Sequence, residues 1–287
     1  MFLTAGGVIK RSIEVYRANF GSLMRYVGLS FAFGILAVVV LVIGLVSIIG
    51  FQAPSAAGLF GLISNLSGSF IAFFIVWAIV FFVLSLWLQI GFIRTVSRAV
   101  RAEPKITIGQ ELKQSRPLIA RTLGSNILVG LITVLPFLIG IVGWTFTNTI
   151  FLLGNSGASA GAWGSIFTIL SFYGFFHMMY FSIRLGFSNL GVMVDGYGIK
   201  ESLQKSSALV KGRWWGILWR IFVVVLALII PYYILLLLSQ IEGFVGIFFG
   251  LVTFVYYILC LLPLAMIPSQ VIYTSAKEFP VVSQPVK

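Results

Sequence analysis

Three long uncharged blocks dominate the pattern of hydrophobic and polar positions along the chain. They cover residues 26–93, 122–183 and 221–276, and Glu242 is the one Asp, Glu, Lys or Arg that they contain. Because a membrane-spanning helix needs about 20 apolar residues, blocks of 68, 62 and 56 residues are too long for one helix each. Each block fits two helices joined by a neutral turn. The pattern therefore predicts six spans: four at about residues 27–49, 70–92, 123–146 and 164–186, a fifth that reaches about Ser239, and a sixth at about 244–267.

The basic residues all lie outside the turns that join the two helices of a block. Of the 19 Lys and Arg residues, four fall in residues 1–25, seven in 94–121, six in 184–220 and two in 277–287. The three joining turns, at about 51–69, 148–163 and 239–243, hold none. The positive-inside rule places segments rich in Lys and Arg in the cytoplasm. We therefore expect a multi-pass protein of the cell membrane with both termini cytoplasmic.

Composition agrees with this class of protein. The chain is 60% hydrophobic and 9% charged, whereas soluble domains are about a quarter charged, which indicates an all-α integral membrane protein. A net charge of +12 could serve nucleic-acid binding, but that function needs a basic soluble recognition element, and the sequence offers none. We interpret the charge as a topology signal and as attraction to anionic lipid headgroups.

The first block follows a short basic amphipathic segment at residues 5–20. Ile9, Ile13, Tyr16 and Phe20 share one helical face. A helix of this kind normally lies in the headgroup plane with its apolar face towards the lipid. We expect it to end at Asn19-Phe20-Gly21, before the chain enters the first span.

The second block follows a similar segment. Thr107 and Gln110 match the capping box, in which each residue's side chain bonds the other's backbone. A helix is therefore predicted to begin at Ile108, with Pro117 interrupting it.

The third segment begins with the turn Asp195-Gly196-Tyr197-Gly198. The sequence predicts a helix from Ile199 to about Val210, with Gly212 after its end. Glu201 and Lys205 have the i, i+4 spacing that favours an ion pair. Tryptophans next to arginines, at the start of the fifth span, are typical of interface anchors.

These three units align with one another at offsets of 99 and 91 residues. We interpret residues 1–273 as one six-span domain of three parallel repeats, each a cytoplasmic interfacial helix and a two-helix hairpin, at about 5–103, 104–198 and 199–273. The alternative is that any multi-span protein with short loops looks periodic. Residues 274–287 are expected to form a flexible cytoplasmic tail.

Residues 195–219 resemble a motif of bacterial six-span membrane domains. These domains occur ahead of glycerophosphoryl diester phosphodiesterase catalytic domains and as stand-alone proteins of unknown role. The matching positions are Asp195-Gly196, Ser202-Leu203 to Ser206, Leu209, Lys211-Gly212-Arg213 and Trp215, with Phe20 and the preceding Tyr16-Arg17-Ala18-Asn19 near the N-terminus. The resemblance implies the six-span fold. No phosphodiesterase domain is recognised in the sequence, so that activity is not carried over.

One polar and aromatic stripe lies within the fourth span. Tyr173, His177, Tyr180 and Arg184 are spaced i, i+4, i+7 and i+11, and an ionisable residue inside a membrane is a candidate functional residue. The stripe predicts either a headgroup, anion or proton site, or hydrogen bonds between helices with Arg184 at the interface. The same two interpretations apply to the polar residues Ser85, Gln89, Asn126 and Thr133.

The sequence does not favour an enzyme. It shows no metal-ligand spacing, no nucleophile with a paired base and no phosphate-binding glycine loop, so no catalytic residue, metal or cofactor is expected. Two functions remain: a lipid-associated scaffold or accessory module with anionic lipids and a membrane protein as partners, and a transporter or channel for a small solute or lipid headgroup. For the first function, the residues expected to contact headgroups are Lys10, Arg11, Arg17, Lys205, Lys211, Arg213, Trp214 and Trp215.

Overall fold

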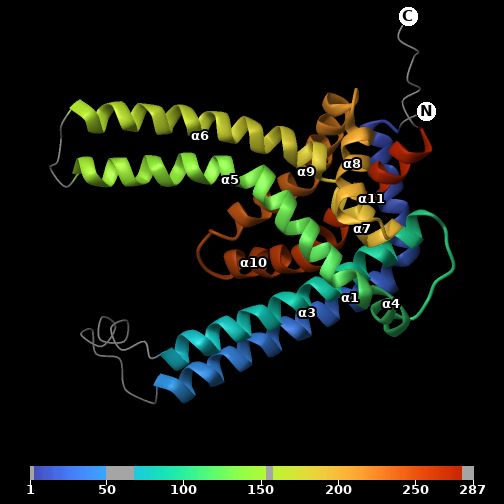
Figure 1. Ribbon diagram of the computed structural model, residues 1–287. Helices are drawn as coiled ribbons and strands as arrows, with labels where there is room; N and C mark the ends of the chain where they lie inside the picture. The colour runs from blue at the N-terminus through green and yellow to red at the C-terminus, as the bar shows by residue number, and fades with distance from the viewer. Residues whose placement is uncertain (1–2, 50–67, 153–157, 280–287) are drawn as a thin grey trace, which may run out of the picture.

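The computed structural model describes residues 3–49, 68–152 and 158–279, and every regular element in these ranges is a helix (Figure 1). Most of the predicted turn at 51–69 and the last eight residues of the predicted tail lie outside the described residues. The elements are α1 (Ala5–Ile49), α3 (Gly68–Val100), α4 (Ile108–Ser115), η1 (Arg116–Leu118), α5 (Ile119–Leu152), α6 (Ala158–Leu185), α7 (Ser188–Asp195), α8 (Ile199–Val210), α9 (Trp214–Leu238), α10 (Phe244–Tyr256), η2 (Tyr257–Leu261) and α11 (Leu262–Glu278).

Six helical stretches are long and apolar enough to cross a membrane, which confirms the predicted all-helical, multi-pass class. They run over residues 5–44, 71–100, 108–149, 163–195, 214–238 and 244–278. Only 6–11% of the residues in their most apolar windows are buried inside the protein. Apolar surface this extensive is favourable only in contact with lipid or another apolar partner.

The spans pair as hairpins that meet at one end of the molecule. In Figure 1, α1 with α3 forms one arm and α5 with α6 a second, while α9 and α10 lie between the arms. The buried core lies where these hairpins meet α7, α8 and α11, and it includes Val8, Ile90, Met193, Ile217 and Tyr273. The fold is therefore held together at the end that carries the chain's charged segments.

The predicted break after the first amphipathic segment is wrong, because α1 is one continuous helix of 45 residues. Gly21 lies on its exposed side, where an added Cβ would meet nothing within 4 Å. The buried face, which includes Val8, Val15 and Leu23, continues past this glycine. One interior glycine costs a helix about 1 kcal/mol, which is less than burying three such side chains contributes. The predicted apolar face differs from the buried one, since Ile13 and Phe20 remain exposed.

The second amphipathic segment forms as predicted. Helix α4 begins at Ile108, and both hydrogen bonds of the Thr107–Gln110 capping box are present. Pro117 interrupts the helix through the short 3₁₀ turn η1, after which α5 begins. Pro117 has no N–H to donate to an α-helical hydrogen bond, which fits the break between α4 and α5.

The third segment also matches its predicted bounds, Ile199–Val210. Gly196 and Gly212, on either side of α8, have φ angles of 72° and 76°, a left-handed conformation that glycine adopts without the steric cost of a Cβ. The structure adds the short helix α7, which the sequence did not predict. Its N-cap, Phe187, makes no side-chain cap hydrogen bond, so no local start signal was present.

The last span contains a π-helical turn, η2, between α10 and α11. Pro263, in the first turn of α11, has no N–H to donate to the carbonyl of Leu259 four residues earlier. The hydroxyl of Tyr16 on α1 donates to that carbonyl instead. Tyr16 therefore satisfies a backbone acceptor that the proline leaves open inside a span.

Helix α11 continues to Glu278 and so includes the first five residues of the predicted tail, 274–278. Ser275 and Ala276 are buried there, so apolar packing extends the helix past the last long apolar run. Residues 274–278, the start of the predicted tail, are therefore helical.

Candidate functional site

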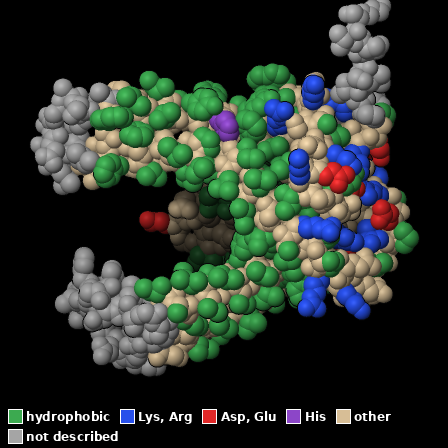
Figure 2. All heavy atoms as spheres, viewed as in Figure 1, with side chains coloured by type: hydrophobic (Ala, Val, Ile, Leu, Met, Phe, Trp, Pro, Cys, Tyr) green, Lys and Arg blue, Asp and Glu red, His purple; other side chains and the backbone are tan. Residues whose placement is uncertain are grey.

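The Lys and Arg side chains gather at the end of the molecule where the hairpins meet, away from the tips of the two arms (Figure 2). We call the Lys and Arg residues of positions 10–25, 94–121, 184–220 and 277 the basic cap. Of the predicted headgroup contacts, the exposed ones are Lys10, Arg11, Arg17, Lys205, Lys211 and Trp215, and the partly buried ones are Arg213 and Trp214. Trp215 is 75% exposed at the start of α9, so a large apolar ring lies beside the cations.

A buried carboxylate fixes α4 to the end of α3. The side chain of Glu111 is 1% exposed and accepts from Nε of Arg94 at 2.6 Å and Nε of Arg98 at 2.9 Å. Gln114 Oε1 accepts from a second nitrogen of each arginine at 3.2 Å. Hydrogen bonds from two arginines offset the cost of burying this carboxylate. Sequence analysis gave Glu111 no role.

A second carboxylate, Asp195, joins α7 to α3 and α11. Its Oδ1 accepts from Arg101 Nη2 at 2.9 Å, and its Oδ2 accepts from Lys277 Nζ at 3.0 Å. The Tyr273 hydroxyl also donates to Oδ2. The prediction placed Asp195 in a turn and in the family motif without partners. The structure makes it the point where three helices of the cap meet.

Beside Asp195, a cavity of about 330 Å³ opens between α8 and α11. We call it the basic pocket, and it is lined by Tyr197, Lys205, Ala208, Leu209, Arg213, Tyr273, Ala276 and Lys277. Lys205 Nζ lies 2.8 Å from Glu201 Oε1, the predicted i, i+4 ion pair. The hydrogen bond from Lys205 lowers the pKa of Glu201, and the same bond raises the pKa of Lys205. Both groups therefore remain charged near neutral pH.

The polar stripe of the fourth span is divided in the structure. Arg184 Nε donates to Ser207 Oγ on α8 at 2.7 Å, and its Nη1 donates to the Tyr180 hydroxyl at 3.3 Å. His177 stacks on the ring of Phe181, 4.4 Å between centroids. Tyr173 is 62% exposed. The structure thus brings Tyr180 and Arg184 together against α8 and leaves Tyr173 on the outer side of α6.

The other polar span residues form hydrogen bonds within and between helices or line a groove. On α5, Asn126 accepts from Asn189 Nδ2 at 2.5 Å, and Ser125 donates to Asn189 Oδ1 at 2.8 Å. Thr133 donates to its own helix at Val129. The contacts of Asn126 fit the interpretation of polar residues that bind neighbouring helices together.

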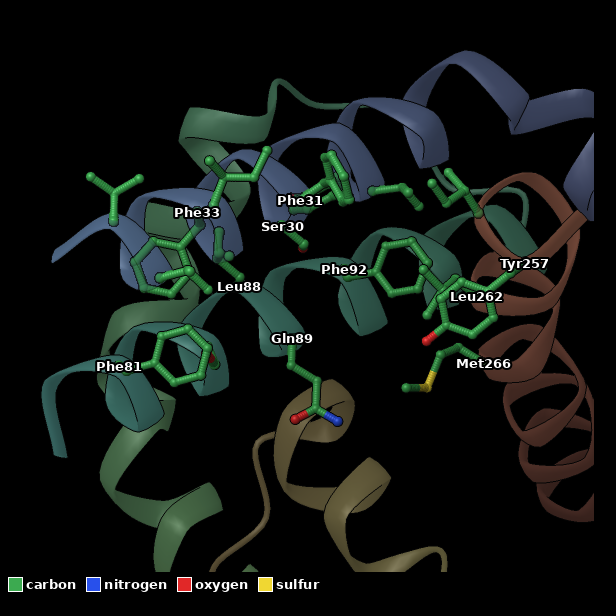
Figure 3. Close-up of a pocket in the computed structure, with 18 residues that line it drawn as sticks. Ser30, Phe31, Phe33, Phe81, Leu88, Gln89, Phe92, Tyr257, Leu262 and Met266 are labelled. Atoms are coloured by element: carbon green, nitrogen blue, oxygen red, sulfur yellow. The ribbon is translucent and has the colours of Figure 1, made fainter. Parts of the chain in front are cut away.

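Ser85 and Gln89 line an apolar groove of about 770 Å³ between α1, α3 and the last span. Figure 3 shows phenylalanines of α1 and α3 on its walls, with Tyr257, Leu262 and Met266 at one end. Its residues are Tyr26, Val27, Ser30, Phe31, Phe33, Gly34, Ile35, Val38, Val39, Phe81, Ser85, Leu88, Gln89, Phe92, Tyr257, Ile258, Leu262 and Met266. The groove suits an apolar group, such as an acyl chain or a helix side chain.

Among residues 3–49, 68–152 and 158–279, no three His, Cys, Asp or Glu side chains come close enough to hold a metal ion. Comparison of the chain with protein-family models, curated proteins and solved structures finds no match. A functional assignment therefore depends on the cap, the pocket and the spans themselves.

Proposed function

We propose that this chain is a non-enzymatic, multi-pass membrane module that binds anionic lipid through its basic cap. The observation that supports this function best is the one-sided distribution of charge: cations gather at one end of six apolar spans (Figure 2), with Trp214 and Trp215 at the start of α9. Lys and Arg near a membrane surface attract anionic lipids, and tryptophan anchors a helix at the headgroup level.

In this proposal the cap faces the cytoplasm of a cell membrane, as the positive-inside rule favours. Helices α4 and α8 each precede a two-span hairpin, which supports three parallel repeats with interfacial helices. The first repeat would differ, since its amphipathic segment is continuous with the span in α1. The resemblance of residues 195–219 to the membrane domains that precede phosphodiesterase domains supports the same arrangement. It also suggests an accessory role next to another membrane protein.

Lipid selectivity tests this function. We would reconstitute the protein into mixed bilayers and measure, with spin-labelled lipids, its preference for phosphatidylglycerol over phosphatidylcholine. Replacing Lys10, Arg17 and Lys211 with Gln removes three exposed charges of the cap. Since each basic residue near the surface contributes about 1 kcal/mol and salt screens part of this, the preference should fall about tenfold.

A matched control lowers the net charge by the same three units at the opposite end of the molecule. Asn148→Asp, Ser239→Asp and Gln240→Glu lie near the tips of the hairpins, away from the cap, and should leave the preference unchanged. An unmodified protein that shows no preference for phosphatidylglycerol would rule out the proposal.

The alternative, a transporter with a polar site on the fourth span, has weaker support. Tyr173 lies on the outer side of α6, and Arg184 is engaged with Ser207 and Tyr180. Solute flux into liposomes that depends on His177 would favour this alternative over the lipid-binding module.

A further inference from the structure

Three cations from separate elements line the basic pocket. Lys205 comes from α8, Arg213 from the corner before α9, and Lys277 from α11. Among the described residues that line the pocket, none carries a carboxylate. Cations that line one small pocket repel one another. Neighbouring carboxylates or a bound anion must offset this repulsion.

Two carboxylates outside the lining supply part of that compensation. Glu201 pairs with Lys205 at 2.8 Å, and Asp195 pairs with Lys277 at 3.0 Å. Asp195 also accepts from Arg101 at 2.9 Å, so its single negative charge is shared between two cations. The two carboxylates thus lie outside the lining, and the charged side chains that line the pocket are Lys205, Arg213 and Lys277.

Aromatic and backbone contacts hold the three cations in place. The ring of Tyr197 lies 3.7 Å from Lys205 Nζ and 5.8 Å from Lys277 Nζ, within reach of cation–π attraction to both. Arg213 Nη1 donates to the carbonyl of Ala276 at 3.3 Å, and its Nη2 donates to that of Phe279. Arg213 thus caps the end of α11, where a cation also complements the helix dipole. A ligand would meet cations that are already positioned, which lowers the entropic cost of binding.

The size and position of the cavity suggest which anion it takes. A volume of about 330 Å³ lies at the low end of ligand cavities, so it fits a headgroup and not a whole lipid. Its lining includes the apolar residues Ala208 and Leu209, and Arg213 immediately precedes the tryptophans that begin α9. A phosphate group offers several acceptor oxygens to several donors at once.

We propose that the basic pocket binds a phosphate group between Lys205, Arg213 and Lys277, carried by an anionic lipid headgroup or by a soluble phosphate compound. This inference rests on the proposed function, since it gives the lipid-binding cap one specific site.

The test combines a pocket variant with a control of equal charge. Lys205→Gln with Lys277→Gln removes two pocket cations, whereas Lys113→Gln with Lys200→Gln removes two exposed lysines that do not line it. Native mass spectrometry of the detergent-solubilised chain would measure how many molecules of phosphatidic acid or of oleate bind. Oleate is the comparison because it is anionic but carries no phosphate. Thermal unfolding with inorganic phosphate or with sodium chloride at equal ionic strength would test the soluble source.

If lipid phosphate is the ligand, the pocket variant should bind the first phosphatidic acid about tenfold more weakly than the control variant does. Oleate binding should fall to the same small extent in the two variants, because each loses two cations of the basic cap. If a soluble compound is the ligand, the pocket variant should instead lose the stabilisation by inorganic phosphate. Equal behaviour of both variants in both assays overturns the proposal. If the pocket variant still prefers phosphatidylglycerol in the spin-label measurement, the proposed lipid-binding function would hold, but without this specific site.

A substitution that strengthens binding guards against variants that only misfold. Glu201→Gln removes the carboxylate that competes for Lys205 and should tighten phosphatidic acid binding several-fold. Glu14→Gln adds the same net charge on α1, outside the pocket, and should not. A Glu201→Gln protein that binds no more tightly than Glu14→Gln would also count against the pocket.

Discussion

At the scale of single residues, the most demanding electrostatic contact in the cap is that of Glu111. Its carboxylate is 1% exposed, and its partners Arg94 and Arg98 are 19% and 25% exposed. Removing one member of a buried ion pair costs about 3–5 kcal/mol, because it leaves charge without a partner. Since the arginines still reach solvent, Glu111→Gln should lower the free energy of unfolding by about 2–3 kcal/mol. Denaturation of the detergent-solubilised protein in SDS, followed by circular dichroism, would measure this change.

The pair Arg11–Glu14 provides the matched control for this substitution. It joins side chains that are 45% and 50% exposed, 3.5 Å apart on the same helix. Surface pairs of this kind contribute about 0–1 kcal/mol, so Glu14→Gln should change stability little. Equal losses in the two variants would show that Glu111 does not fix α4 to α3 through its charge.

At the scale of helices, glycines set the close approach of α5 and α6. A Cβ on Gly174 would lie 2.6 Å from Cα of Phe137, and one on Gly140 would lie 2.6 Å from the backbone N of Ser171. Gly174→Ala must therefore push the helices apart, and overpacking of this kind costs about 1–3 kcal/mol. The change should appear as a lower unfolding temperature and as a longer distance between spin labels on the two helices.

Gly130, on helix α5 of the same hairpin, is the control. A Cβ added there would meet nothing within 4 Å, so Gly130→Ala should be neutral or slightly stabilising through helix propensity. If Gly174→Ala behaved like Gly130→Ala, the packing of this hairpin would not depend on glycine contact.

A helix could be predicted from the sequence where nearby residues mark its start or its end. Helix α4 was predicted from Thr107, Gln110 and Pro117, which act within a few residues of one another. The break expected at Gly21 failed, because a buried face on both sides of a glycine outweighs its small helix penalty. Helix α7 and the π turn of the last span were missed. The π turn combines Pro263 with a hydroxyl from Tyr16, 243 residues from the carbonyl that accepts it.

The same limit applies to the candidate site. The one-sided placement of Lys and Arg could be predicted, because their distribution along the whole chain already separates one end of the protein from the other. The partners of Asp195 could not, because Arg101 and Lys277 lie 94 and 82 residues away and only the packing of α3, α7 and α11 brings them together. The stripe from Tyr173 to Arg184 was predicted from helical spacing alone, which does not tell which face of α6 meets another helix.

At the scale of the whole molecule, the two arms enclose a hollow with largely hydrophobic walls, and α9 and α10 lie between them (Figure 2). Large exposed side chains include Phe172 on α6, Leu237 on α9 and Phe244 on α10. In water, an apolar surface of this extent would drive association. In a bilayer it is covered by lipid, so the separation of the arms is compatible with a stable fold in the membrane.

This arrangement predicts which residues an impermeant thiol reagent reaches in intact cells. We would first replace Cys260, the one cysteine of the chain, with Ser. Single cysteines would then be introduced at two exposed positions: Glu242, between α9 and α10, and Lys200, on α8 of the basic cap. Because moving the cap's cations across a bilayer is costly and the positive-inside rule keeps them cytoplasmic, the cysteine at 242 should react with external reagent. The cysteine at 200 should react only after the membrane is permeabilised. Labelling in the reverse order would place the cap outside, and it would remove the cytoplasmic lipid surface on which the proposed function depends.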